Sequence, residues 1–134
     1  MRSSRGEAAG IPTLADRRKD TPRLRRALLR LRKRCPVGVP VRVVRVKRPV
    51  CRWRGRVESV TAYASTIQNT RTKKLARFRI TLSTRLSGDH LIDVLAHEWA
   101  HCMDRRTRSR NPRGDVHDTR WGQHYSRAWR ATFP

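Results

Sequence analysis

The amino-acid sequence predicts a small α+β domain with an N-terminal helix, a short three-stranded sheet and two C-terminal helices. Two observations support this prediction. Apolar residues recur at helical spacing near both ends of the 134-residue chain, and valine-rich or alternating segments fill its middle. Residues 1–19 are basic and lack periodicity, so we expect a flexible arm there, followed by one domain over residues 20–134.

The first helix is expected to begin at Thr21, a residue type that caps helices, with Pro22 in the first helical position. An apolar stripe follows at spacings of three and four residues, formed by Leu24, Ala27, Leu28 and Leu31. Cys35 and Pro36 end the segment, because proline cannot continue a helix. This pattern predicts a helix that packs one face on the core.

Extended segments are expected in the middle of the chain. A valine-rich strand covers residues 39–46, and after Pro49 a second extended segment covers residues 55–66. The clearest strand follows, with apolar residues at every second position, namely Ala76, Phe78, Ile80 and Leu82. We expect this strand to lie at the sheet edge, where an extended polypeptide could pair with it.

Two helices are predicted in the C-terminal part. The first covers residues 90–104, after an N-terminal capping signal at Ser87, Gly88 and Asp89. The second covers residues 117–133, with aromatic residues on one side. A basic loop joins them at residues 105–114. Its arginines either follow phosphate groups or simply face solvent, and the sequence leaves both interpretations open.

The charge balance indicates a polyanionic partner. Lys and Arg number 33 against 10 Asp and Glu, which gives a formal net charge of +23. Because nucleic acid is the commonest polyanion in cells, we expect non-specific DNA binding through an arginine-rich surface. A small arginine-rich chain of this kind would suit a phage or bacterial genome.

The cysteines and the apolar segments bear on cellular location. The chain has three cysteines, without a CxxC pair, which argues against a disulfide framework and against a cysteine-based zinc ribbon. Residues 1–20 lack the apolar stretch of a signal peptide, and no apolar run approaches membrane length. We therefore expect a cytoplasmic protein without a membrane partner.

The segment from His97 to His101 has the pattern HExxH within an apolar-periodic stretch. Residues four apart lie on the same helical face, so His97 and His101 can reach one metal ion. Zinc favours imidazole ligands, and catalytic zinc sites keep a position open for water. Glu98 lies beside the first histidine, where its carboxylate can accept a proton from that water. The pattern predicts zinc as the cofactor and Glu98 as the catalytic base.

The HExxH pattern supplies two ligands, so a third must come from elsewhere. The residue types that bind zinc recur at His90, His117, His124, Asp104, Asp115 and Asp118. His117 and His124 are seven residues apart, or about 10 Å along a helix, so one helix cannot bring both to one ion. We favour His117, which follows a loop, while a carboxylate such as Asp115 remains an alternative.

This pattern resembles the SprT-like (Spartan-like) zinc metallopeptidases. The resemblance covers about residues 78–129 and has three parts: Ile80-x-Leu82-Ser83-x-x-Leu86, then HExxH, then His117-Asp118-x-x-Trp121. It implies a zincin-like domain in which His97, His101 and His117 bind zinc and Glu98 is the general base. The family is associated with cleavage of proteins on DNA. This sequence differs in having Asp118 where glycine is usual.

The sequence therefore predicts a zinc-dependent metalloendopeptidase that acts on proteins near or on DNA. One alternative is a basic nucleic-acid-binding module with a structural zinc ion. Glu98 argues against it, because a structural site needs no base beside an open position. Another alternative is an HExxH peptidase specific for one protein, such as a repressor.

Overall fold

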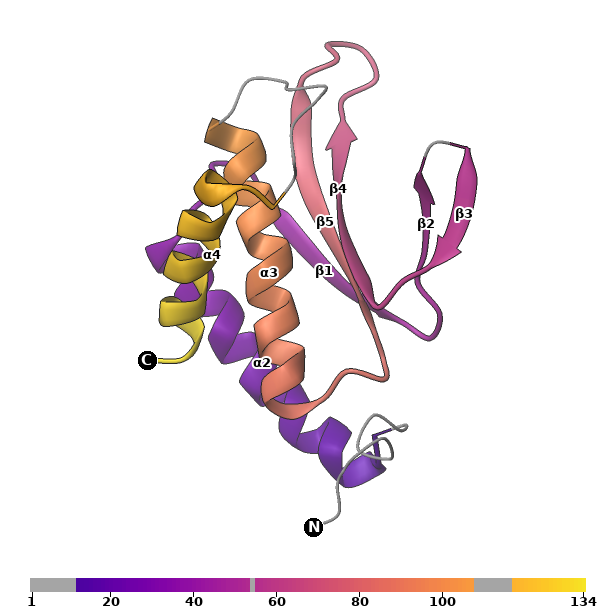
Figure 1. Cartoon of the computed structure of the whole chain (residues 1–134), viewed down its shortest axis with the longest axis vertical. Helices are drawn as coiled ribbons and strands as arrows, with labels where there is room; N and C mark the ends of the chain where they lie inside the picture. Colours follow the sequence, from indigo (N-terminus) through magenta and orange to yellow (C-terminus); the bar gives the residue numbers. More distant parts are fainter. Residues whose placement is uncertain (1–11, 54, 108–116) are drawn as a thin grey trace.

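The computed structural model describes residues 12–53, 55–107 and 117–134. Three helices lie against one side of a small sheet, as Figure 1 shows. The helices are α2 (Leu14–Arg34), α3 (Gly88–Thr107) and α4 (Thr119–Thr132). The strands are β1 (Val41–Val46), β2 (Val50–Trp53), β3 (Arg56–Ser59), β4 (Ala62–Gln68) and β5 (Leu75–Ser83). The predicted α+β class, with an N-terminal helix, a small mixed sheet and two C-terminal helices, is confirmed.

The main sheet has the strand order β1-β5-β4. Strand β5 pairs in parallel with β1 and antiparallel with β4, so it lies in the centre. The prediction that this alternating strand forms the sheet edge is therefore wrong. The alternation correctly marks its buried face, because Phe78, Ile80 and Leu82 are fully buried, but it carries no information about the number of neighbouring strands.

The second extended segment, predicted over residues 55–66, is divided between two sheets. Strands β2 and β3 form a separate antiparallel hairpin, and β4 joins the main sheet after a break at Val60 and Thr61. Gly55 supplies the left-handed backbone of the hairpin turn, with φ of 78°. Every residue of β3 is exposed, so the sequence of this strand has no pattern of buried residues from which the hairpin could be predicted.

Helix α2 begins at Leu14 and not after Thr21, so the predicted start is wrong. Thr13 is the true cap: its side chain accepts a hydrogen bond from the Asp16 amide, and the Asp16 carboxylate accepts one from the Thr13 amide. Pro22 lies inside the helix at an exposed position, where water can satisfy the unpaired carbonyl. Residues 14–19 are thus helical, while residues 1–11 of the predicted arm lie outside the described residues.

The core lies between the helices and the inner face of the main sheet. Its centre is Trp99 of α3, which is 1% exposed and whose indole nitrogen donates to the carbonyl oxygen of Cys35 at 2.8 Å. Cys102, one turn further on, is also fully buried, and burial raises the pKa of its thiol to about 12. Helix α3 contacts both other helices and two strands, so its position is held from several sides. A rigid element of this kind can hold functional side chains in fixed positions.

Two further features concern the described helices and the cysteines. Of the described helices, none is both long enough and apolar enough to span a membrane. Cys35, Cys51 and Cys102 are free thiols, in keeping with the expected lack of a disulfide framework.

Candidate metal centre

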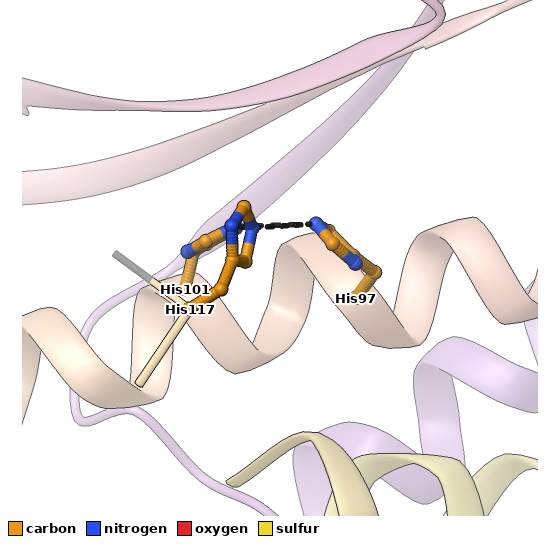
Figure 2. Close-up of side chains that lie close together, drawn as sticks. All are labelled: His97, His101 and His117. Atoms are coloured by element: carbon orange, nitrogen blue, oxygen red, sulfur yellow. Dashed lines mark hydrogen bonds between the residues drawn. The ribbon is translucent and has the colours of Figure 1, made fainter. Parts of the chain in front are cut away.

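Two helices contribute the histidines of the candidate site. His97 and His101 lie one turn apart on the half-buried side of α3, and His117 lies just before the start of α4. Figure 2 shows the three imidazole rings converging beside α3. Among the described residues, these three histidines are the group whose side chains could together hold a metal ion. The structure thus brings together the three residues that the sequence singled out.

The distances between the ring nitrogens match a tetrahedral zinc site. The Nε2 atom of His97 lies 3.3 Å from those of His101 and His117, and the last two are 3.2 Å apart. Two ligand nitrogens about 2.05 Å from zinc at the tetrahedral angle are separated by roughly 3.3–3.4 Å. The three nitrogens therefore stand close to the corners of one tetrahedral face, and the residues present fit the ion.

The start of α4 fixes the position of His117. Asp118 is the N-cap of this helix, and its carboxylate accepts a hydrogen bond from the Trp121 amide at 3.0 Å. The cap determines where the chain enters α4, and His117 is the residue immediately before it. Because α4 packs along α3, this entry point lies beside the HExxH turn.

The indole ring of Trp121 packs against the rings of all three histidines. The ring of Trp121 lies 4.8, 5.2 and 4.7 Å from the rings of His97, His101 and His117, measured between centroids. Trp121 is only 8% exposed, and Tyr125 stacks on it at 5.2 Å with an interplanar angle of 14°. Trp121, one helical turn after His117, thus packs against the ring of that histidine.

Glu98 lies in a buried position next to the histidines. It is 7% exposed, and its Oε2 atom is 3.9 Å from the Nε2 atom of His97. Burial raises the pKa of this carboxyl group to about 7, against a weaker opposing effect from Arg105. A cation held by the three histidines would favour the charged carboxylate and lower this pKa again.

His97 and His101 are held in the neutral form that binds metals. Burial, assisted by the neighbouring His97 and His117, lowers the pKa of His101 to about 3. Burial is also the main cause of the lowered pKa of His97. Both rings are therefore neutral near pH 7, with lone pairs available on the converging nitrogens.

The other candidates for a third ligand lie elsewhere or outside the described residues. His124 lies 3.9 Å from Asp104, measured between Nε2 and Oδ1, and both side chains are 13% exposed. Asp118 caps α4, and His90 lies at the beginning of α3, about 10 Å along the helix from His97. Asp115 is not among the described residues, and neither are Arg108, Arg110 and Arg113 of the basic loop.

The sequence analysis missed a pair of residues beside the site. The hydroxyl group of Tyr125 donates a hydrogen bond to the carboxylate of Asp93, and its ring lies 5.9 Å from that of His97. The spacing of these two residues along the sequence could have revealed the pair. Asp93 precedes His97 by one helical turn, and Tyr125 follows Trp121 by one turn, so both belong to the faces that meet at the histidines.

Comparison with known proteins adds nothing to this geometry, since no family model, no curated protein and no solved structure matches the chain. The described residues by themselves show one candidate site. It is a possible three-histidine metal centre, with an HxxxH pair on one helix and a distant third histidine. Such an arrangement is compatible with a zincin-type site.

Proposed function

We propose that this chain is a zinc-dependent metallopeptidase of the SprT-like type. The observation that supports the proposal is the set of three Nε2 atoms, 3.2–3.3 Å apart, beside the buried carboxylate of Glu98. Three histidines leave the fourth tetrahedral position open, as in catalytic zinc sites. A structural site would need no acidic side chain next to that position, so this layout favours hydrolysis over a purely structural metal.

The roles of the protein groups follow from their positions. His97, His101 and His117 would hold the ion, which when bound polarises a carbonyl group and acidifies a water molecule. The Glu98 carboxylate accepts a proton from the water whose oxygen attacks the carbonyl carbon of the peptide. When the carbon–nitrogen bond breaks, Glu98 returns that proton to the leaving amine nitrogen. Trp121 keeps the histidine rings in place from behind.

A substrate polypeptide can pair with the free edge of β4. Within the described residues β4 pairs with β5 alone, and it packs against α3, which carries the site. An extended chain that adds to this edge obtains main-chain hydrogen bonds whatever its sequence. The edge expected from the sequence at residues 76–82 is thus replaced by that of β4.

We further propose that the substrates are proteins on or near DNA. The support for this is the net charge of +23 together with the SprT-like pattern. A peptidase specific for one protein, such as a repressor, is the alternative, and it predicts cleavage that does not depend on DNA.

The proposal is tested by incubating zinc-loaded protein with a basic DNA-binding protein, with and without DNA. Glu98→Gln is the matched control, because glutamine fills the same space but cannot accept the proton. We expect fragments only with the unaltered protein, and more of them when DNA is present. Equal cleavage with and without DNA would refute the proposed dependence on DNA. Equal cleavage by the Glu98→Gln variant would refute the assigned mechanism.

A further inference from the structure

A cavity lies at the other end of the sheet from the hairpin that joins β4 and β5. It has a volume of about 630 Å³ and is lined by the loops after β1, after β3 and after β5, together with the first turn of α3. These loops meet at the lower edge of the sheet in Figure 1. The carboxyl ends of the parallel strands β1 and β5 both point to this edge.

The rim of this cavity is positively charged. Lys47, Arg48 and Arg85 line it with exposed side chains, and His90 lines it from α3. Among the described residues that line the cavity, none is acidic. Two nearby carboxylates are engaged with other partners: Asp20 accepts from the Gly88 amide, and Asp89 pairs with Arg23 of α2.

The interior of the cavity is suited to more than a bare anion. Pro49 and Leu86 are buried and give it an apolar floor, while Ser59, Thr61 and Ser87 contribute hydroxyl groups. Apolar surface with a few hydroxyl groups suits a sugar or a base, and the basic rim suits phosphate. The volume falls in the usual range for small-ligand sites, about 300–1,000 Å³.

The walls of the cavity are held together by backbone hydrogen bonds. The amide of Val60 donates to the carbonyl of Pro49, and the amide of Thr84 donates to the carbonyl of Val46, at 3.1 and 2.9 Å. The half-buried guanidinium of Arg45 donates to the carbonyls of Ser83 and Leu86 at 3.0 and 2.8 Å. These bonds fix the three loops relative to one another, so little ordering is needed when a ligand binds.

We propose that this cavity, the phosphate pocket, binds the phosphodiester backbone of a nucleic acid. It combines a cationic rim, an apolar floor and fixed walls in a chain of net charge +23. His90 and His97 are seven residues apart on the same face of α3, about 10 Å along its axis. A nucleic acid held in the pocket therefore lies about two helical turns along α3 from the histidine site. Its relevance to proteolysis rests on the proposed function, whereas the binding does not.

The experiment measures binding of a fluorescent oligonucleotide at several salt concentrations. All variants carry Glu98→Gln and zinc, so proteolysis cannot affect the result. The pocket variant changes Lys47, Arg48 and Arg85 to Gln. The control variant changes Lys74, Arg25 and Arg26 to Gln, which are exposed and do not line the pocket. Relative to the protein that carries Glu98→Gln alone, both variants lower the net charge by the same three units.

We expect the pocket variant to lose at least about tenfold in affinity, with the slope of log K against log salt reduced by roughly 2–3. The control variant should lose a few-fold at most. Equal losses in the two variants would show binding by diffuse charge and overturn the proposal. Competition by polyglutamate at equal charge concentration would also overturn it. Circular dichroism and zinc content verify that both variants fold.

Discussion

Replacement of His117 by alanine should weaken zinc binding far more than replacement of His124, although both histidines lie beyond the basic loop. The Nε2 atom of His117 is 3.2 and 3.3 Å from those of the other two histidines, whereas His124 lies beside Asp104. A structural zinc site of four ligands is worth about 10–16 kcal/mol, or roughly 2.5–4 kcal/mol per ligand. Loss of one ligand therefore corresponds to about 10²–10³-fold in affinity.

The His124→Ala variant should keep its zinc affinity within a few-fold. It removes a mostly buried side chain next to Asp104, so its cost is expected in folding stability, at about 1–2 kcal/mol. Trp121 continues to support the three zinc-binding rings in this variant. His117→Ala should thus lower the affinity for zinc, whereas His124→Ala should lower the thermal stability of the protein.

Competition against a chromophoric zinc chelator measures the affinities, and thermal unfolding in excess zinc measures stability. If His124→Ala loses zinc and His117→Ala retains it, the convergence of the three nitrogens does not describe the binding site. If both variants retain tight binding, Asp115 or another carboxylate provides the third ligand and the placement of His117 is wrong. A His117→Asp variant that restores part of the affinity would support a ligand role at this position.

Three further predictions follow from the same structure. Removal of zinc by a chelator should lower the unfolding temperature by roughly 5–10 °C, because a ligand at 100 times its Kd stabilises by about 2.7 kcal/mol; an unchanged melting curve, or purified protein without stoichiometric metal, would contradict it. Glu98→Gln should bind zinc normally and lose at least about 10²-fold in proteolysis, since it removes the proton acceptor; wild-type cleavage by this variant would show that Glu98 is not the base. Thr13→Ala should destabilise the protein by about 1 kcal/mol, because it removes the cap of α2; denaturant unfolding measures this, with Thr21→Ala, which the sequence wrongly suggested as the cap, as the control of smaller effect.

The part of the site on α3 could be predicted because it depends on local geometry alone. The four-residue spacing of His97 and His101 fixes their common face once the segment is helical. The apolar residues around them made the helix evident, and the structure extends it over Gly88–Thr107. The third histidine is different. Its approach depends on how α4 packs on α3, and spacing along the chain left Asp115 as an alternative to His117.

The predicted start of the first helix was wrong because the sequence holds two capping signals of similar strength. Thr21 followed by Pro22 and Thr13 followed by Asp16 are both possible helix starts, and propensity alone cannot choose between them. The structure uses the earlier start because Asp20 then lies within the helix, where its buried carboxylate accepts from the Gly88 amide. That hydrogen bond joins residues 68 apart in the sequence. Such a tertiary contact outweighs the unfavourable effect of Pro22 inside the helix.

The central position of β5 in the sheet could not be predicted from the local sequence either. Alternation records which side of a strand is buried, while edge or central placement depends on partners elsewhere in the chain. Val41 and Thr66 both pair with Phe78, from opposite sides of β5. Their segments lie before and after the exposed hairpin of β2 and β3, whose residues contribute little to the core.

The arrangement of the histidines links metal binding to the folding of the C-terminal part. His97 and His101 belong to the most firmly packed helix, but His117 reaches them only when α4 is docked on α3 with Trp121 and Tyr125 between them. An ion that binds all three histidines therefore binds the docked state more tightly than any state with α4 detached, and it stabilises docking by that difference in affinity. It follows that zinc should protect the amides of α4 from hydrogen exchange more than those of α3. The amides of α3 are already protected by the core around Trp99, whatever the occupancy of the site.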